Sequence, residues 1–345
     1  MKIAVAVSGG ADSLYALSAL KAAGHELLAL HGRFVSPRQD PLPGLREQCA
    51  LLKIPLHVAV LQEQFRQHVI DPFVAAYAAG QTPNPCAQCN RLMKFGVLLD
   101  IAEELGAERL ATGHYAVFAE HPAYGFTLRR AADCRRDQSY FLALVPKERL
   151  ARAVFPLADA VKGLIPGKLA GQGLAAPLSK ESREICFVPD DDYRAFLEEY
   201  AEQLPGCGPM CLRDDRVVGR HEGLWRYTEG QRRGLGLAWS EALYVLEKDC
   251  VRNKLVLGTA AELRIRACSA DRLNVFVPAE QWPERVFVRT RYSQVPQAAD
   301  VTTTGDGMDV RFHEPQTACA PGQLACVCDE DGWVLSAGII RTERN

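Results

Sequence analysis

The sequence predicts an α/β protein in which a parallel-sheet domain is followed by a small middle module and a C-terminal β-barrel. Three observations support this fold class. Strand and helix patterns alternate along the first half of the chain, which is typical of a parallel sheet with helices on both faces. A glycine-rich turn joins the first strand to the first helix. After Leu263, short apolar runs separated by turn residues replace the helical patterns, as expected for a small barrel.

The first strand and helix are the clearest elements of the first half. Lys2–Val7 is an apolar run expected to form a buried strand. The spacing of Leu14, Leu17 and Leu20 predicts one apolar face of a helix that ends at Gly24. The same criteria predict further strands at Leu27–His31, Leu56–Val60 and Arg109–Thr112, and helices at Leu45–Lys53, Glu63–Ala79 and Arg91–Leu105. Parallel strands of this kind bind ligands at their carboxyl ends.

The pattern changes at about Asp190. A helical stretch at Asp192–Tyr200 leads into a loop rich in Pro, Gly and Cys, and the rest of the chain reads as short strands. These strands are expected at Val217–Gly219, Tyr244–Glu247, Leu255–Leu257, Arg285–Tyr292, Met308–Phe312, Leu324–Val327 and Val334–Ile339. We therefore expect three domains, at residues 1–188, 189–263 and 264–345.

The composition is that of an ordinary globular protein. The 345 residues are 48% hydrophobic and 24% charged, with a formal net charge of −2, so any nucleic-acid contact must come from local basic patches. No apolar run approaches the roughly 20 residues of a membrane span, and a core strand begins directly after Met1. We therefore expect a cytoplasmic protein without a signal peptide or a membrane partner. In that compartment most of the 12 cysteines should be reduced and buried.

The turn after the first strand, Ser-Gly-Gly-Ala-Asp-Ser at residues 8–13, has the features of a phosphate-binding loop. Its glycines let the backbone approach an anion, Ser8 and Ser13 add hydroxyl donors, and the N–H groups of the next helix point to the same place. It is not a Walker loop, because Gly-Lys-Ser/Thr is missing. A Gly-Gly turn with only a structural role is the alternative. The six residues resemble the pyrophosphate loop of the ATP-pyrophosphatase superfamily, whose members adenylate a substrate oxygen and release pyrophosphate.

This resemblance implies an ATP site in which Mg²⁺ bridges the phosphates near Asp12. Gly32 and Gly113 come at the ends of two further strands and should lie at the same edge of the sheet. His114 follows Gly113 and is expected to support the active site; a purely structural histidine is the alternative. The expected ATP-binding residues are Ala6, Val7, Ser8, Gly9, Gly10, Ala11, Asp12, Ser13, Gly32 and Gly113.

A second cluster, Thr-Pro-Asn-Pro-Cys-Ala-Gln-Cys-Asn-Arg-Leu-Met-Lys-Phe at residues 82–95, contains two candidate reactive cysteines. Its two prolines make the approach rigid. Asn90 is expected to cap a helix and to place Cys89 at the helix N-terminus. There the helix dipole, with Arg91 and Lys94 nearby, should favour the thiolate. The spacing Cys86-x-x-Cys89 alone is compatible with a redox motif, half a zinc site or iron–sulfur ligation.

Further motifs follow in order, and one of them contains a third candidate, Cys186, downstream of Lys180 and Arg183. These motifs are Ala-Thr-Gly-His-Tyr-Ala (111–116), Asp-Gln-Ser-Tyr-Phe-Leu (137–142), Ile-Cys-Phe (185–187), Tyr-Thr-x-Gly-Gln-Arg-Arg-Gly-Leu-Gly (227–236) and Pro-Gly-Gln (321–323). Together with the loop and the cysteine cluster, they make the chain resemble the bacterial tRNA-specific 2-thiouridylases of the MnmA type over essentially its whole length.

The resemblance implies a tRNA-uridine 2-sulfurtransferase. ATP would adenylate the 2-oxygen of the wobble uridine and release pyrophosphate, and sulfur from a cysteine persulfide would then displace AMP. By position in the motifs, Cys89 would be the nucleophile and Cys186 the persulfide carrier, which would leave a Cys89–Cys186 disulfide to be reduced. The implied partners are a tRNA with a wobble uridine and a sulfur-donor protein, either a cysteine desulfurase or a relay protein.

Cys86 departs from the family pattern, which has an aspartate three residues before the nucleophilic cysteine. A carboxylate is a better general base near neutrality than a thiol with an ordinary pKa of about 8.5. The replacement also creates three thiols, Cys86, Cys89 and Cys186, that could ligate a [4Fe–4S] cluster and deliver sulfide from its open iron. Persulfide relay and cluster-mediated transfer therefore both remain open.

Family position also implies where tRNA binds, since a wobble-base enzyme must extract one base and neutralise phosphates. Asn84, Pro85 and Cys86 should line the base pocket. The other expected tRNA-binding residues are Arg136, Asp137, Gln138, Arg232, Arg233, Arg291, Tyr292 and Gln323. Each arginine taken alone would be an ordinary solvated side chain.

Two other function classes account for part of the sequence. An amide-forming ATP-pyrophosphatase that acts on a small acid would need the phosphate loop, but neither the cysteine pair nor the barrel. A non-catalytic tRNA- or cluster-binding protein would keep the fold, but the intact phosphate loop argues against it. Absence of ATP–pyrophosphate exchange in the presence of tRNA would favour the non-catalytic class.

Overall fold

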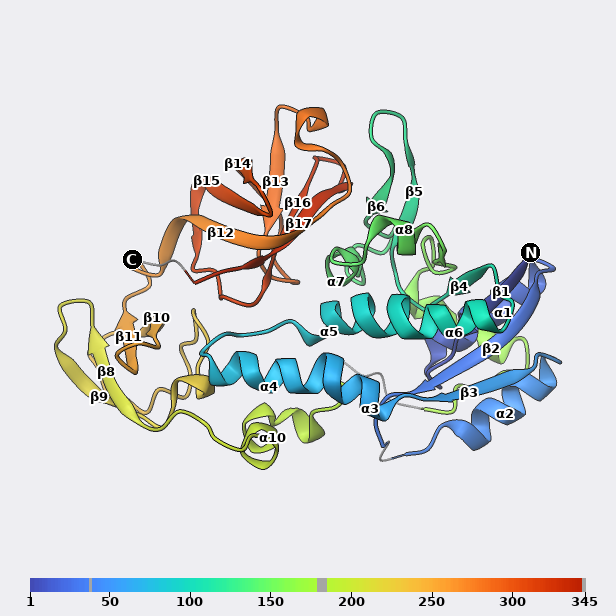
Figure 1. Cartoon of the computed structure of the whole chain (residues 1–345), viewed down its shortest axis with the longest axis horizontal. Coiled ribbons are helices and arrows are strands. Elements are labelled where there is room, and N and C mark those ends of the chain that lie inside the picture. The colour runs from blue at the N-terminus through green and yellow to red at the C-terminus, as the bar shows by residue number, and fades with distance from the viewer. Residues whose placement is uncertain (37–38, 179–184, 343–345) are drawn as a thin grey trace.

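The computed structural model describes residues 1–36, 39–178 and 185–342 (Figure 1). It contains a parallel sheet with surrounding helices, then a four-stranded sheet, and finally a closed barrel. This order confirms the predicted fold class. Within these ranges, no helix combines the length and the hydrophobicity that a membrane span requires.

The N-terminal sheet has the strand order β3-β2-β1-β4-β7, and all neighbouring strands run parallel. Its strands are β1 (Lys2–Ala6), β2 (Glu26–Arg33), β3 (Leu56–Val60), β4 (Arg109–Ala111) and β7 (Ala153–Val154). Successive side chains of β1 point to opposite faces. Ile3 packs in one apolar cluster with Leu17. Ala4 packs in the other cluster with Phe65, so helices cover both faces as predicted.

Short helices surround this sheet, and a hairpin extends from it beside the barrel (Figure 1). The helices are α1 (Ala11–Ala22), α2 (Leu42–Leu51), α3 (Gln62–Phe65), α4 (Asp71–Ala78), α5 (Pro85–Gln88), α6 (Leu99–Glu104), α7 (Ser139–Leu142), α8 (Lys147–Leu150), α9 (Ile165–Ala170) and α10 (Tyr193–Tyr200). The hairpin consists of β5 (Val117–His121) and β6 (Gly125–Arg129).

The helix predicted at Glu63–Ala79 forms as α3 and α4 joined by a wider π-helical segment, Arg66–Ile70. Pro72 lies at the start of α4 and has no backbone N–H to donate. An unbroken α-helical ladder is therefore not available there, and the wider turn accommodates the missing donor.

The helix predicted at Arg91–Leu105 begins earlier than expected, at Pro85, and runs through the π-helical segment Cys89–Leu98 into α6. A kink occurs at Gly96, whose φ of −97° and ψ of −109° are not helical. Arg149 satisfies the carbonyls at this kink, because Nε donates to Phe95 O at 2.6 Å and Nη2 donates to Gly96 O at 2.8 Å.

The middle module is a sheet with the order β10-β11-β8-β9. Its strands are β8 (Gly208–Leu212), β9 (Val217–His221), β10 (Tyr244–Asp249) and β11 (Lys254–Gly258). The three short strands predicted here lie within β9, β10 and β11. The sequence predicts a loop where β8 forms, because Gly208 and Pro209 are poor strand formers. Pairing with β9 and β11 on its two sides overrides that preference.

The C-terminal barrel closes in the order β12-β15-β14-β13-β16-β17. Its strands are β12 (Arg264–Val275), β13 (Val286–Arg289), β14 (Gln297–Thr304), β15 (Gly307–Thr317), β16 (Leu324–Cys328) and β17 (Val334–Ile340). Strands β12 and β14 are not among the predicted strands, since both are rich in polar side chains and lack a regular alternation of buried and exposed residues.

Polar contacts join the barrel to the N-terminal part of the chain. Arg289 of β13 forms an ion pair with Asp137, with 3.0 Å between Nη2 and Oδ2, and both side chains are buried. The hydroxyl of Thr127 in β6 donates to the carbonyl of Val334 in β17. The barrel therefore packs against the hairpin and the segment that leads into α7 (Figure 1).

Candidate functional site

The phosphate-loop candidate lies between β1 and α1 and is held in shape by its two serines. Ser13 Oγ accepts a hydrogen bond from Ser8 N at 3.1 Å and donates to Gly10 O at 3.0 Å. Gly9 has a φ of +93°, and a Cβ there would lie 2.6 Å from Pro41 Cβ, so only glycine fits. The N-cap of α1 is Gly10, which has no side chain to cap the helix, so within the described part of the chain the first N–H groups of α1 are available to an anion.

Asp12 lies in the first turn of α1, and both of its carboxylate oxygens have partners. Oδ1 accepts from the Tyr115 hydroxyl at 2.9 Å, and Oδ2 accepts from Lys162 Nζ at 2.6 Å. Lys162 brings a positive charge to the phosphate loop from 150 residues away in sequence. Neither Tyr115 nor Lys162 can be recognised as a partner of Asp12 from the sequence, because no local pattern connects either residue with the loop.

The ends of β2 and β4 lie at the same edge of the sheet as the loop. A Cβ on Gly113 would lie 2.9 Å from Ser13 N and 3.0 Å from the Asp12 carbonyl carbon, so the chain after β4 packs directly against the loop backbone. At the end of β2, a Cβ on Gly32 would lie 2.9 Å from the ring of Phe34. The predicted ATP-binding residues therefore lie at one edge of the sheet, where the parallel strands β1, β2 and β4 end.

The helix that carries the cysteine cluster is capped by Asn84, not by Asn90. Asn84 Oδ1 accepts a hydrogen bond from Ala87 N at 3.1 Å, and Pro85 is the first helical residue. Asn90 lies inside the helical stretch, and its side chain donates to Phe141 O at 2.9 Å. The prediction for Asn90 is therefore wrong, and Cys89 lies one turn into the helix, where the N-terminal dipole acts less strongly.

Cys89 is a buried thiol and not the stabilised thiolate that the sequence predicts. Burial raises its pKa to about 12, although the nearby Lys94 ammonium acts in the opposite direction. Cys86 and Cys186 are more exposed, and partial exclusion of water also raises the pKa of each. All three are free thiols, and each interacts electrostatically with at least one of the others. They therefore form one thiol site.

Lys94 connects this thiol site to the end of β4. Lys94 Nζ lies 3.3 Å from His114 Nε2, and His114 Nδ1 lies 2.7 Å from Thr112 Oγ1. Burial, together with the Lys94 charge, holds the pKa of His114 well below its usual value, so its ring is neutral. A neutral ring that accepts from Lys94 through Nε2 must donate from Nδ1 to Thr112. Because Gly113 precedes His114 and touches the phosphate loop, one short segment contacts both halves of the site.

The described residues contain no group of three or more His, Cys, Asp or Glu side chains arranged to hold a metal ion. Mg²⁺ usually binds through one or two carboxylates together with substrate phosphates. Asp12 is compatible with that role as a single protein ligand.

Four of the expected tRNA-binding residues have exposed side chains. Cys86, Arg232 and Arg233 are exposed. Tyr292 is 38% exposed and stacks on Phe141 with 4.5 Å between ring centroids. These side chains are accessible to a large ligand.

The other expected tRNA-binding residues make contacts within the protein. Asp137 is buried in its ion pair with Arg289, and Gln138 Oε1 accepts from Tyr115 N at 3.0 Å. Arg291 Nη2 donates to Glu229 O at 2.8 Å. Arg136 is partly buried, Asn84 and Pro85 are buried, and Gln323 contacts the segment before Asn84. Lys180 and Arg183, expected near Cys186, lie outside the described residues.

Three family models match consecutive parts of the chain. They are described as the tRNA methyl transferase HUP domain at residues 1–190, the tRNA methyl transferase PRC-barrel domain at residues 194–259 and the aminomethyltransferase beta-barrel domain at residues 265–340.

Curated relatives match the chain from end to end. Proteins from Lawsonia intracellularis and Oleidesulfovibrio alaskensis, each named tRNA-specific 2-thiouridylase MnmA, are 49% and 52% identical to it. Both alignments cover 99% of this chain, and they cover 100% and 99% of the relatives. The relative of the same name from Nitratidesulfovibrio vulgaris strain Miyazaki F is 50% identical, with 99% of each chain covered. A solved complex of a 4-thiouridine synthetase with RNA and ATP matches only weakly, with a TM-score of 0.34, 17% identity and coverage of 57% of this chain and 50% of that chain.

Proposed function

This chain belongs to the MnmA family of tRNA-specific 2-thiouridylases and forms 2-thiouridine in tRNA, and we propose that it does so by ATP-dependent adenylation followed by a persulfide relay. The proposal rests on one observation: a single short segment contacts both the phosphate loop and the thiol site. Gly113 touches the phosphate loop, and its neighbour His114 holds the lysine that lies beside the thiols. Activation of the 2-oxygen by ATP and attack of sulfur at C2 can therefore occur on one uridine base without its release.

In the first step the 2-oxygen of the wobble uridine attacks the α-phosphorus of ATP, and pyrophosphate leaves. A carbonyl oxygen is a poor leaving group until it carries AMP. The free N–H groups at the start of α1 and the Lys162 ammonium would neutralise the phosphates. Mg²⁺ bound to ATP would add charge neutralisation, with Asp12 as its protein ligand.

In the second step the terminal sulfur of a persulfide on Cys186 attacks C2 of the adenylated base, and AMP leaves. The Cys89 thiolate then attacks Cys186 Sγ and breaks its bond to the transferred sulfur, which stays on the base. A Cys89–Cys186 disulfide results, and an external thiol must reduce it before the next cycle. Exposed Cys186 is accessible to a sulfur-donor protein, a cysteine desulfurase or a relay protein.

Buried Cys89 must lose its proton before it attacks, and Lys94 is the cation that favours this ionisation. In the family pattern an aspartate is expected to act as the base, and Cys86 replaces it here. Burial also raises the pKa of Cys86, so its thiol stays protonated near neutrality and little thiolate is present to accept the proton.

We further propose that tRNA binds across Cys86, Tyr292 and the loop with Arg232 and Arg233. Tyr292 offers a ring on which a base can stack, and the two arginines offer charge for phosphates. The cytoplasmic location expected from the sequence is part of the same proposal, since ATP and tRNA are present there.

The test combines a thiolation assay with metal analysis. Under the relay, anaerobically purified protein is free of iron and thiolates tRNA from a persulfide donor. Cys89→Ser and Cys186→Ser keep tRNA-dependent ATP–pyrophosphate exchange but make no 2-thiouridine. Binding of about four irons and acid-labile sulfide that Cys86→Ser abolishes would instead establish the cluster alternative.

A further inference from the structure

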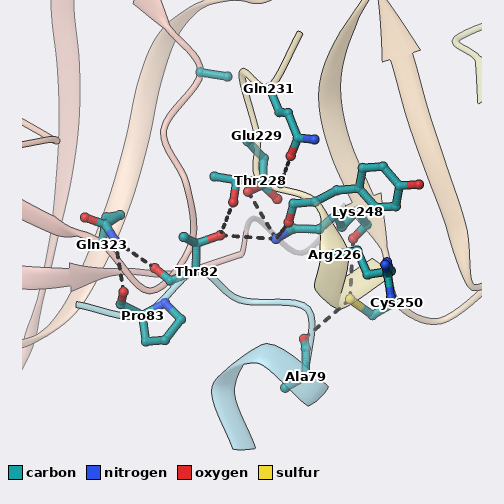
Figure 2. Close-up of polar contacts among 12 residues, drawn as sticks. Ala79, Thr82, Pro83, Arg226, Thr228, Glu229, Gln231, Lys248, Cys250 and Gln323 are labelled. Atoms are coloured by element: carbon teal, nitrogen blue, oxygen red, sulfur yellow. Dashed lines mark hydrogen bonds and ion pairs between the residues drawn. The ribbon is translucent and has the colours of Figure 1, made fainter. Parts of the chain in front are cut away.

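The connection between α4 and α5, residues 79–84, is held by both C-terminal units. In Figure 1 it extends from the helices toward the middle module and the barrel. Figure 2 shows Thr82 at the centre of the resulting network, with barrel residues on one side and middle-module residues on the other. Each polar atom of Thr82 has a partner outside the N-terminal part of the chain.

The barrel holds the Thr82 backbone. Thr82 N donates to Pro321 O at 2.7 Å, and Gln323 Nε2 donates to Thr82 O at 2.9 Å and to Pro83 O at 3.1 Å. The turn between Pro321 and Gln323 packs closely against Thr82, because a Cβ on Gly322 would lie 2.9 Å from Thr82 O. With a φ of +94°, Gly322 is also a position that favours glycine.

The middle module holds the Thr82 side chain. Thr82 Oγ1 donates to Thr228 Oγ1 at 3.2 Å and accepts from Lys248 Nζ at 3.3 Å. Lys248 also donates to Tyr227 O at 3.0 Å and lies 3.4 Å from Glu229 Oε2. The Lys248 side chain is only 1% exposed, so its ammonium is held inside the protein by two hydrogen bonds and this ion pair.

Removing two charged side chains from water is costly, and apolar side chains of the same size would pack two units together equally well. A buried lysine specifies geometry, because its ammonium must meet its hydrogen-bond acceptors and its carboxylate partner at the same time. Lys248 thereby fixes the position of Thr82, which lies two residues before Asn84. Pro83 and Pro85 restrict the intervening backbone, so a displacement of Thr82 moves the base pocket.

We propose that Thr82 is a positioning residue through which the middle module and the barrel set the position of the base pocket and of the helix that carries Cys86 and Cys89 (the thiol helix). This inference rests on the proposed function and adds a role for the two C-terminal units. Their contact with tRNA fixes the segment that presents Asn84, Pro85 and Cys86 to the base. Thr82 itself touches neither reactant.

Thr82→Val keeps the β-branched shape and removes the hydroxyl, and Thr82→Ser keeps the hydroxyl. Because small misplacements of a reacting group are expensive in rate, Thr82→Val should lower kcat for tRNA thiolation by about 10-fold to 100-fold. The KM for ATP should stay within about two-fold, since the phosphate loop is remote from this network. Thr82→Ser should restore most of kcat. Thr228→Val removes the acceptor of the same hydroxyl and should lower kcat without adding to the effect of Thr82→Val.

Thr127→Val is the matched control. It removes another buried threonine hydroxyl that bridges the N-terminal part to the barrel, but it lies in the hairpin and not beside the base pocket. It should lower the melting temperature and leave kcat unchanged. A kcat for Thr82→Val within two-fold of wild type, an equal loss of kcat in Thr127→Val, or a failure of Thr82→Ser to rescue would overturn the proposal.

A second readout separates this inference from the proposed function. The alkylation rate of exposed Cys86, measured by peptide mass spectrometry without tRNA or ATP, should change several-fold in Thr82→Val and Thr228→Val but not in Thr127→Val. Wild-type protein that makes no 2-thiouridine would contradict the proposed function, and the Cys86 rates would still decide the role of Thr82. Unchanged Cys86 rates in both valine variants would refute the positioning role.

Discussion

Cys89 should be an unreactive thiol in the free enzyme, and its alkylation by iodoacetamide measures this directly. With a pKa of about 12, roughly one Cys89 in 10⁴ is ionised at about pH 8, against roughly one in four for an ordinary thiol of pKa about 8.5. A more basic thiolate is a stronger nucleophile, by roughly 40-fold over this interval for a Brønsted coefficient of about 0.45. Both factors together leave Cys89 roughly 60-fold slower than an ordinary cysteine, before steric exclusion is counted.

The pH dependence is the sharper signature. A raised pKa means that the thiolate fraction of Cys89 grows about ten-fold per pH unit throughout the range from about pH 7 to pH 9. Cys207 is an internal reference in the same sample. It is exposed, and a hydrogen bond from Arg220 lowers the pKa of its thiol, so its rate should level off within that range.

The assay is alkylation over a pH series, with each cysteine resolved by peptide mass spectrometry and with Cys89→Ser and Cys207→Ser to assign the peptides. Repetition with ATP and tRNA asks whether substrate binding lowers the pKa of Cys89. A Cys89 alkylation rate that levels off below about pH 9 in the free enzyme, or that equals the Cys207 rate at pH 7, would contradict a raised pKa for Cys89.

Three further predictions concern the phosphate loop, the barrel contact and the replaced aspartate. Gly113→Ala should raise the Kd for ATP at least about ten-fold in calorimetry, because its Cβ would lie 2.9 Å from Ser13 N. Gly167→Ala is the control: its Cβ meets no atom within 4 Å, so this variant should bind ATP normally. Arg289→Met should lower the free energy of unfolding by about 3–5 kcal/mol in urea denaturation, since it leaves buried Asp137 without its charge partner. The Arg289→Met/Asp137→Asn double variant should recover part of this loss, and a loss below about 1 kcal/mol for Arg289→Met would contradict the argument. Cys86→Asp should keep or increase the rate of tRNA thiolation in iron-free protein, because a carboxylate is the better base, and a decrease measured by 2-thiouridine analysis would count against the relay.

Several elements could be predicted because their causes are local. The apolar run of β1, the glycines that follow it and the periodic leucines of α1 act over a few residues, and the structure has each of them in place. The same holds for β9 to β11. Strands β12 and β14 could not be found in this way, since their polar sequences form strands only when neighbouring strands supply the hydrogen bonds.

The thiol helix shows where local reasoning fails. Asparagine is a common helix-capping residue, but the helix already begins at Pro85, before Asn90. The Asn90 amide instead donates a hydrogen bond to Phe141. The expected thiolate at Cys89 fails for a related reason. A dipole and a nearby lysine can be read from sequence, whereas the burial that outweighs them depends on side chains from distant segments.

The amino-acid sequence was enough to predict the fold class and to locate the candidate phosphate loop and the three candidate cysteines, because residue type and spacing control backbone conformation and chemical identity. Only the tertiary structure decided the electrostatic state of Cys89, the pairing of Lys162 with Asp12 and the burial of Asp137 against Arg289. It also placed Thr82 between the two C-terminal units. Desolvation and ion pairing depend on which atoms the fold brings within a few ångströms, and these atoms come from segments far apart in the chain.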